Sequence, residues 1–318
     1  MSIAEFVRIL GRGPGRSRSL TQDEAHEAMA RVLRGEAAPE SIGAMLMLMR
    51  MKGEVPEELA GFTAAFRDVL TAVPTPDLDW PSYAAGRTRG LPWFLLSARL
   101  VALGGHKVLL HGWNGLGQSG HLVREGLADA GITRCAGPDE AAEVLARDNI
   151  AYLPLEGFSP ALLRLLQLRA DFGLRSCLNT VARMLNPGGA GASVQGVFHP
   201  PYRELQADAS HLLGLKAMSV IKGGGGEFER NPTKDIQVFG LRDGKPWEML
   251  LPPSLEDTRK LNDGETDVSR LSALWRGDLD DPFAEAIVLA TAALALDTLG
   301  VENAEARAAE LWQTRHIL

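Results

Sequence analysis

Apolar positions in the first seventy residues recur at helical spacing, between clear start and stop signals. Thr21 and Glu24 form a capping-box pattern in front of a helix that ends near Gly35. A second helix follows Pro39 and ends at Gly53. Because its middle is apolar all round, we expect it to be buried among other helices.

A third helix begins at Pro56, and the proline-rich stretch 73–76 ends it. That stretch is the best candidate boundary in the chain. The pattern therefore predicts a small helical domain over residues 1–74.

After residue 80 the pattern changes to short β-rich runs that alternate with amphipathic helices. This alternation indicates an α/β domain with a mainly parallel sheet. The predicted strands are 107–111, 150–155, 193–198 and 217–222, with a hairpin at 235–241 and 246–251. Two alanine-rich helices, from about 283 to 300 and from 302 onward, complete the chain.

The composition is that of a soluble globular protein, with 45% hydrophobic and 23% charged residues. The 33 Lys and Arg against 40 Asp and Glu give a formal charge of −7, which argues against a surface that coats nucleic acid as a whole. Two cysteines cannot build a thiol zinc site or a disulfide framework. The apolar stretch 286–296 has 11 residues, too few to span a bilayer, and the first residues lack a signal-peptide pattern, so we expect a cytoplasmic protein without a membrane partner.

The segment 111–120 leaves a predicted strand and enters a helix. Its sequence, His-Gly-Trp-Asn-Gly-Leu-Gly-Gln-Ser-Gly, supplies free backbone N–H groups at a positive helix end, which is a geometry that holds phosphate. Asn114 and Ser119 can add hydrogen bonds. Glycine-rich strand-to-helix turns also occur without a ligand, so the local pattern leaves both interpretations open.

Two further glycine-rich segments carry charge. Gly86, Arg87 and Arg89 precede a helix opened by Pro92, where two arginines can clamp a phosphate or a carboxylate, or keep a loop in water. Four consecutive glycines at 223–226 indicate a flexible lid or a close approach to a ligand.

Two carboxylates and a local basic excess add to these segments. Glu227 and Glu229 follow the four glycines and offer oxygen ligands for Mg²⁺, which is a weak metal signal. Residues 164–234 hold nine basic and five acidic residues, an excess that suits an anionic ligand or a solvated helix face.

Several segments in this order resemble the anthranilate phosphoribosyltransferase family, which is glycosyltransferase family 3 with a class II nucleoside phosphorylase-like fold. In the N-terminal part these are 20–25, 44–54 and 57–61. His111-Gly112-Trp113-Asn114 stands in the place of the family's Lys-His-Gly-Asn loop, and Ser119-Gly120 in that of its phosphate-binding serine and glycine. The segment 169–175 resembles its Arg-x-x-Leu-Gly-x-Arg motif, in which the first arginine faces the anthranilate carboxylate.

The resemblance implies a fold and an activity. The fold is a small all-helical domain, residues 1–74 completed by helices around 158–185, and a larger α/β domain over 75–318 with a mainly parallel sheet. The ligand cleft lies between them, and the small domains form a homodimer. The activity is pentosyl transfer from phosphoribosyl pyrophosphate (PRPP) to a nitrogen acceptor, with Mg²⁺.

The resemblance also assigns site residues, although none is given a catalytic role. Gly86, Arg87 and Arg89 would contact pyrophosphate, and Arg169 an acceptor carboxylate. The phosphate would be held by His111, Gly112, Asn114, Ser119 and Gly120. Glu227 or Glu229 would face the metal.

Departures from the family pattern leave a second function open. The loop at 85–90 has arginines where the family's Gly-Thr-Gly-Gly-Asp loop has an acid, and the aspartate of the metal-binding Asp-Glu pair is missing. Such departures resemble the divergent YbiB-like branch, which keeps the fold and the dimer and is associated with nucleic-acid binding. The sequence therefore supports a phosphoribosyltransferase with degenerate PRPP and metal motifs, or a non-catalytic protein that binds single-stranded nucleic acid.

Overall fold

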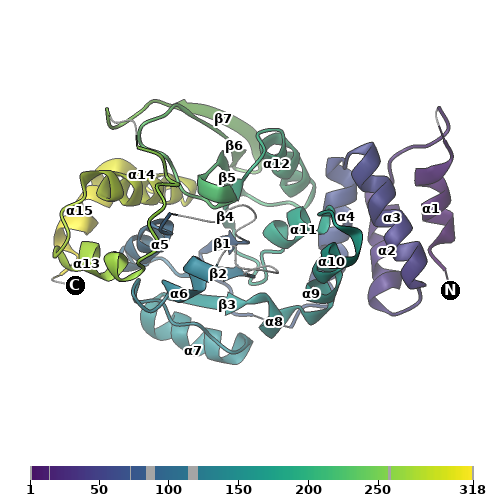
Figure 1. The fold of residues 1–318 in the computed structure, drawn as a ribbon, viewed down its shortest axis with the longest axis horizontal. Helices are drawn as coiled ribbons and strands as arrows, with labels where there is room; N and C mark the ends of the chain where they lie inside the picture. The colour runs from purple at the N-terminus through teal and green to yellow at the C-terminus, as the bar shows by residue number, and fades with distance from the viewer. Residues whose placement is uncertain are drawn as a thin grey trace.

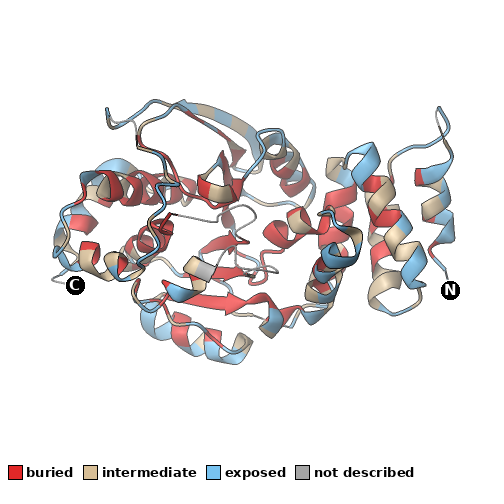
Figure 2. Cartoon of the chain, viewed as in Figure 1, coloured by how far each residue is buried: buried red, intermediate tan, exposed pale blue. Residues whose placement is uncertain are grey.

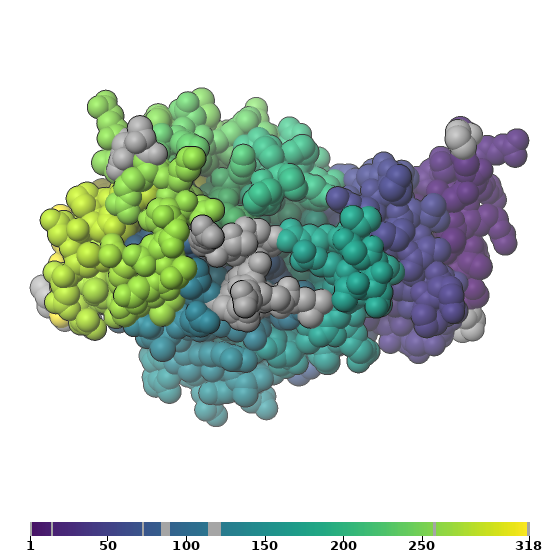
Figure 3. Space-filling model, in the orientation of Figure 1, coloured from purple at the N-terminus to yellow at the C-terminus, as the bar shows by residue number. Residues whose placement is uncertain are grey.

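The structure is a computed structural model. It describes residues 2–13, 15–71, 73–83, 90–113, 121–256 and 259–316. Figure 1 shows an elongated molecule with its two termini at opposite ends. N-terminal helices form one end, and C-terminal helices form the other, with a sheet between them (Figure 1). Figure 3 shows the two ends on the surface, purple for the N-terminal residues and yellow for the C-terminal ones.

The N-terminal end consists of α1 (Ala4–Gly11), α2 (Gln22–Leu33), α3 (Pro39–Lys52) and α4 (Pro56–Arg67). The predicted capping box is confirmed: the Glu24 backbone N–H donates to Thr21 Oγ1, and the Thr21 N–H donates to Glu24 Oε2. Helices α2 and α4 pack in direct contact. They lie so close that a Cβ on Gly61 would overlap the backbone of Gln22.

Helix α3 is less buried than its sequence predicts. Met45, Leu46 and Met49 are fully buried, but Ala44 is exposed and Met51 near the end of the helix is 83% exposed. The expectation of a helix buried all round is therefore wrong for this chain. Helix α1 packs against α3, but other positions around the circumference of α3 stay exposed.

A seven-stranded sheet forms the centre in the order β3-β2-β1-β4-β5-β6-β7. Its strands are β1 (Leu78–Ser82), β2 (Val108–Gly112), β3 (Ile150–Pro154), β4 (Ala192–Val197), β5 (Ala217–Lys222), β6 (Ile236–Arg242) and β7 (Lys245–Leu251). The first five in the sheet are parallel, and β6 and β7 are antiparallel. The predicted hairpin turns at Asp243 and Gly244, which both have positive φ, as a type I′ turn requires.

Strand β1 has no counterpart among the predicted strands. It contains Pro81, and a proline argues against a central strand because it cannot donate to the ladder. The sheet tolerates it because β4 pairs with β1 only at Leu78 and Asp79. Pro81 lies beyond that pairing.

The remaining helices include those that cover the two faces of the sheet. They are α5 (Phe94–Leu103), α6 (His121–Glu125), α7 (Pro138–Asp148), α8 (Leu155–Phe158), α9 (Pro160–Gln167), α10 (Arg169–Phe172), α11 (Leu178–Met184), α12 (Tyr202–Leu212), α13 (Ser269–Arg276), α14 (Pro282–Thr298) and α15 (Ala304–Thr314). Among the described residues, no helix is long and apolar enough to cross a membrane.

Two large apolar cores form on opposite faces of the sheet. Val108 and Leu110 of β2 join a core with α5, α13, α14 and α15, whereas Leu109 between them joins a second core. This second core contains α1–α4 together with α7, α8, α9 and α11, so the middle helices pack with the N-terminal ones. Figure 2 shows the buried inner faces. The domain boundary at residue 74 stays a prediction.

Candidate functional site

The sheet opens a crevice between β1 and β4. The chain runs from β1 to β2 on one side and from β4 to β5 on the other, so the strand order reverses at this pair. Pairing stops after Leu78–Ala192 and Asp79–Ser193, and the carboxyl ends of the two strands separate. In open α/β sheets, ligands bind at such a switch point outside the carboxyl ends of the strands.

A buried polar network lines one side of this crevice. His111 Nδ1 and the Tyr83 hydroxyl share a hydrogen bond of 2.9 Å, and His111 Nε2 lies 3.1 Å from Asp79 Oδ1. Asp79 Oδ2 in turn accepts from the Ser193 hydroxyl at 2.8 Å. The network therefore joins the ends of β1 and β2 to the start of β4.

His111 and Gly112 were predicted to hold phosphate. Both lie in the interior, and the two ring nitrogens of His111 face Tyr83 and Asp79. Gly112 must be glycine, since a Cβ there would overlap the Ser82 carbonyl oxygen. In this arrangement the His111 ring links the ends of β1 and β2 through its contacts with Tyr83 and Asp79. A phosphate contact would have to come from the backbone that follows Gly112.

Arg183 and Glu227 form the other side of the crevice. Arg183 is 6% exposed, and its Nη1 donates to the Asn179 carbonyl oxygen at 2.7 Å. Burial lowers the pKa of this guanidinium, and the nearby Glu227 carboxylate opposes the shift. Glu227 is fully buried because its backbone packs directly on Gly196 of β4, where a Cβ would overlap it.

The four glycines form a tight turn. Residues Gly224–Gly226 make one turn of 3₁₀ helix, η1, in which Gly225 and Gly226 have positive φ. A Cβ on Gly223 would overlap the Glu227 carbonyl oxygen. The close approach that four glycines predict is thus made by the chain to itself, and it fixes the position of Glu227.

Glu229 has a structural partner at the start of α5. Its Oε2 accepts from the Phe94 backbone N–H at 3.0 Å, and its side chain is fully buried. A carboxylate at a helix N-terminus is favourable, because it meets free N–H groups and the positive end of the helix dipole.

These contacts bear on the predicted metal site. Glu229 accepts a hydrogen bond from the first turn of α5, and the Glu227 carboxylate lies near the Arg183 guanidinium. Within the described ranges, no group of three or more His, Cys, Asp or Glu side chains is placed to hold a metal ion. Mg²⁺ is often held by one or two carboxylates together with substrate phosphates, so a Mg²⁺ site at Glu227 or Glu229 stays a prediction.

A basic cavity of about 100 Å³ lies at the mouth of the crevice. Arg50 of α3, Arg175 before α11 and Arg183 all line it, together with Phe198 and His199 after β4. Phe198 is 47% exposed, and its ring contacts that of His199 edge-on. Burial lowers the pKa of Arg175, and the positive charges of Arg169 and Arg183 add to this effect. The structure thus gathers cations from α3 and from the segment 175–183 at this mouth.

Most of the predicted ligand residues lie outside the described residues. These are Gly86, Arg87, Arg89, Asn114, Ser119 and Gly120. The described neighbours place their segments: Tyr83 precedes residues 84–89 at the end of β1, and Trp113 precedes residues 114–120 at the end of β2. Arg169 is described and exposed at the start of α10.

An arch formed by residues 259–270 holds the other end of the 84–89 segment. The Gly90 N–H donates to the Glu265 carbonyl oxygen at 3.0 Å, and a Cβ on Gly90 would overlap the Leu261 carbonyl oxygen. Gly90 also has φ +86°, so both its conformation and its packing require glycine.

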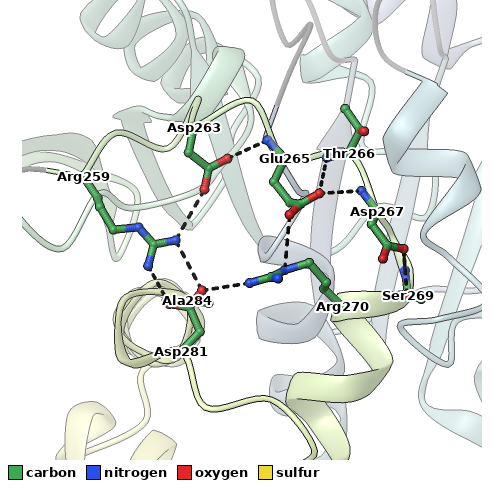
Figure 4. Close-up of polar contacts among 9 residues, drawn as sticks. All are labelled: Arg259, Asp263, Glu265, Thr266, Asp267, Ser269, Arg270, Asp281 and Ala284. Carbon is green, nitrogen blue, oxygen red and sulfur yellow. Dashed lines mark hydrogen bonds and ion pairs between the residues drawn. The ribbon is translucent and has the colours of Figure 1, made fainter.

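Ion pairs give the arch its shape (Figure 4). Arg259 and Arg270 converge on Asp281, which also caps α14 by accepting from the Ala284 N–H. Burial is the largest single influence on the pKa of Asp281 and raises it. The contacts with Arg259, Arg270 and the Ala284 N–H together outweigh burial and lower this pKa overall. The arch is therefore anchored to the C-terminal helices.

Sequence reasoning did not single out several of these residues. Arg183 enters the sequence analysis only as part of the basic excess, Arg175 ends the 169–175 motif without a role of its own, and Arg50 lies in the N-terminal motif. Tyr83 and Asp79 gave no signal, because β1 itself was not predicted. The register pairs Pro81 with His111 and Ser82 with Gly112, which brings Tyr83 next to this pair. The sequence alone does not give this register.

Comparison with known proteins agrees with this architecture. Residues 4–69 match the helical bundle domain of a glycosyl transferase family, and residues 94–312 match its a/b domain. Anthranilate phosphoribosyltransferase from Thermus thermophilus is 29% identical over 279 residues, covering 86% of this chain and 84% of the relative. The enzyme from Oleidesulfovibrio alaskensis is 30% identical over 259 residues, covering 80% of this chain and 76% of the relative.

Solved structures show the same fold. The crystal structure of the Thermus thermophilus anthranilate phosphoribosyltransferase superimposes with a TM-score of 0.82 at 25% identity, over 98% of this chain and 94% of that one. The Saccharomyces cerevisiae enzyme in complex with PRPP and Mg has a TM-score of 0.77 at 16% identity, over 99% and 93%, and shows the fold alone. The chain belongs to the glycosyl transferase family that joins a helical bundle to an a/b domain and includes the anthranilate phosphoribosyltransferases.

Proposed function

We propose that the chain binds PRPP in the crevice between β1 and β4 and transfers its ribose 5-phosphate to a nitrogen acceptor. The observation that carries the proposal is Arg183, a buried guanidinium at the switch point whose cavity also holds Arg50 and Arg175. Three cations around a small cavity suit a ligand with several negative charges. The PRPP complex of the yeast relative supports the choice of donor.

The reaction needs little covalent chemistry from the protein. The bond from C1′ to the pyrophosphate oxygen breaks as the acceptor nitrogen attacks, and the main task is to stabilise the departing pyrophosphate. We assign this task to arginines, with Gly86, Arg87 and Arg89 on the pyrophosphate and Arg183 behind them. Backbone groups after His111 and Gly112, together with Asn114, Ser119 and Gly120, would hold the 5-phosphate at the start of a helix.

Arg169 is proposed to receive a carboxylate of the acceptor. It is exposed at the start of α10 and close enough to Arg175 to lower the pKa of that group. An Arg169→Ala variant is expected to bind PRPP like the parent protein and to lose affinity only for a carboxylated acceptor. Weakened PRPP binding in this variant would contradict the assignment.

The direct test is calorimetric titration with PRPP, with and without Mg²⁺. Arg183→Gln should bind PRPP at least about tenfold more weakly, since a charge-assisted hydrogen bond contributes about 1.5–3 kcal/mol. Arg99→Gln is the matched control, because Arg99 is also a partly buried arginine but stacks on Trp275 away from the crevice. Arg183→Lys, which keeps the charge, should retain part of the affinity. Equal PRPP affinity in both glutamine variants, with folding verified by circular dichroism, would refute the proposed site.

We further propose that turnover with anthranilate itself is absent or very weak. The 85–90 loop lacks the acid of the family motif, and the carboxylate of Glu229 is committed to α5. A steady-state assay with PRPP, Mg²⁺ and anthranilate should give less than about 1 s⁻¹, the lower end of ordinary enzyme rates. Faster turnover would contradict this prediction.

Single-stranded nucleic acid is the second candidate ligand. Exposed Phe198 lies beside the arginines of the crevice mouth, and an aromatic ring next to cations is the arrangement that stacks a base and holds its phosphate. We expect weak binding, because the chain carries a net charge of −7. We also expect the affinity to fall steeply with salt, because contacts to phosphates release counterions. Fluorescence anisotropy with a labelled single strand should show a loss for Phe198→Ala and none for Leu250→Ala, a control in which the apolar side chain is even more exposed.

A homodimer through the helical end is proposed as the assembled form. Met51 of α3 is 83% exposed and the neighbouring Met47 and Leu48 are half-buried, which leaves an apolar strip on this helix. Sedimentation velocity should give a dimer for the parent protein and a larger monomer fraction for Met51→Glu. A parent protein that is still monomeric at about 50 µM, a concentration at which a dimer of ordinary affinity would form, would refute the proposal.

A further inference from the structure

A second cavity, of about 610 Å³, lies away from the crevice between β7 and the C-terminal helices α14 and α15. We call it the outer cavity. Its volume is in the range of small-molecule sites. The residues that line it are Arg230, Met249, Leu251, Ala293, Leu294, Asp297, Val301, Glu302, Asn303, Ala304, Glu305 and Ala306.

Arg230 supplies a buried positive charge. The residue is 4% exposed, and its Nη2 donates to the Pro252 carbonyl oxygen at 2.7 Å. Its Nε is buried without a hydrogen-bond partner in the part of the chain that the structure describes. A buried donor of this kind is costly to leave unpaired, so it indicates that a ligand group completes the site.

The start of α15 adds a second feature that attracts negative charge. Asn303 precedes the helix in the left-handed conformation, and its side chain makes no capping hydrogen bond to the first turn. Ala304, Glu305 and Ala306 of this turn line the outer cavity. Helix α15 has 11 residues, and the free N–H groups of such a helix start favour a carboxylate or a phosphate.

Carboxylates stand on the same cavity. Glu302 and Glu305 are exposed at its edge, and Glu305 lies near enough to Arg230 to oppose the lowering of its pKa by burial. Asp297 differs from both, because it is paired with Arg242. The cavity therefore offers one buried cation with a helix start and two carboxylates that are able to receive a cation.

The remaining wall is apolar. Met249 and Leu251 come from β7, Leu294 from α14 and Val301 from the turn before α15. A simple anion would be repelled by Glu302 and Glu305, and a simple cation would be repelled by Arg230. A ligand that carries both charges next to an apolar group satisfies all three sets of residues.

We propose that the outer cavity binds an α-amino acid with an apolar side chain. The carboxylate of the amino acid meets Arg230 and the start of α15, its ammonium group meets Glu302 and Glu305, and its side chain packs against Met249 and Leu251. No covalent step is involved. The proposal does not rest on PRPP binding in the crevice.

The test is calorimetric titration of the full chain with L-phenylalanine, L-leucine, 3-phenylpropionate and phenethylamine. The last two keep the aromatic group and remove the ammonium or the carboxylate. We expect both amino acids to bind and both analogues to bind at least about tenfold more weakly, because each loses one charge-assisted contact. Equal binding of 3-phenylpropionate would overturn the proposal in favour of a plain carboxylate site, and no binding of any of the four would overturn it entirely.

Variants on the surface of α15 locate the site without disturbing the core. Ala306→Leu places a larger side chain on the cavity wall and should weaken L-phenylalanine binding at least tenfold, roughly the effect of losing one good contact. Ala309→Leu, on the same helix but outside the cavity lining, should have no effect. Glu302→Gln should also weaken binding, whereas Glu310→Gln, whose carboxylate pairs with Arg307, should not. Binding that is unchanged in both Ala306→Leu and Glu302→Gln would place the ligand elsewhere and refute the assignment.

Discussion

The crevice and the outer cavity each contain a buried arginine, and the surroundings of the two arginines differ. Arg183 in the crevice has Glu227 on one side but shares its cavity with Arg50 and Arg175, so positive charge dominates. Arg230 in the outer cavity shares its space with Glu302 and Glu305. Burial lowers the pKa of both guanidinium groups. Neighbouring charge, rather than the arginine itself, is therefore the reason that we propose a polyanion for one place and a zwitterion for the other.

One short segment connects the two regions. Glu227 packs on β4 at the crevice, Glu229 caps α5, and Arg230 reaches the outer cavity. A displacement of this segment would therefore be felt at both places.

The largest effect is expected from Gly196→Ala in β4. Its new Cβ would overlap the backbone of Glu227, and backbone cannot move aside cheaply. The free energy of unfolding should fall by about 3 kcal/mol or more, as for severe overpacking. Gly191→Ala is the matched control, because no atom lies within 4 Å of a Cβ there, and it should change stability by less than about 1 kcal/mol. Urea unfolding measures both, and equal stabilities would show that the segment adapts.

A smaller loss is expected from Tyr83→Phe on the crevice side. The change removes the hydroxyl that bonds to buried His111 Nδ1 and leaves this nitrogen without a partner. An unsatisfied buried acceptor costs about 1–3 kcal/mol of unfolding free energy. Tyr202→Phe, whose hydroxyl donates to Glu54 at 3.3 Å in a half-exposed position, should cost less than about 1 kcal/mol. Equal losses in the two variants would remove the special role of the network.

Sequence alone predicts most of the fold, because the signals are local. The capping box at Thr21, the hairpin at Asp243 and Gly244, and four of the five parallel strands follow from neighbouring residues. Strand β1 escapes because Pro81 violates the rule for a central strand. The reason it fits, the early end of pairing with β4, is a property of the assembled sheet.

The site is predicted less well, because its described residues meet only through tertiary structure. Arg50 lies more than a hundred residues before Arg175 and Arg183, and no local pattern brings it to them. Glu229 was predicted as a metal ligand from its residue type, but its carboxylate meets the start of α5, which is more than a hundred residues away in sequence. Gly86, Arg87, Arg89, Asn114, Ser119 and Gly120 stay predictions.

Alkaline pH should destabilise the chain through the two buried thiols of the core that contains α1–α4. Burial raises the pKa of Cys135 to about 11 and raises the pKa of Cys177 beside Arg175 still more strongly. The folded chain keeps these protons at a pH where the unfolded chain, with thiol pKa values near 8.5, has released them. Stability therefore falls as pH rises above that value, by about 1 kcal/mol between pH 8 and 9. Urea unfolding at both pH values should show this loss in the parent protein and not in Cys135→Ala/Cys177→Ala. A loss of the same size in the double variant would assign it to other groups.

The smallest effect is expected from Asp297→Asn at the outer cavity. Asp297 pairs with Arg242, but its side chain is 42% exposed, so water screens the pair and the expected loss is only about 0.5 kcal/mol. Arg242 also stacks on Trp247 and donates to the Met218 carbonyl oxygen, and both contacts survive the change. Because this carboxylate is already neutralised, L-phenylalanine affinity should stay within about twofold of the parent value, a difference well below 1 kcal/mol. Glu302→Gln should weaken it at least about tenfold. Urea unfolding and calorimetry measure the two effects, and a tenfold loss of affinity in Asp297→Asn would mean that Asp297, and not Glu302, receives the ammonium group.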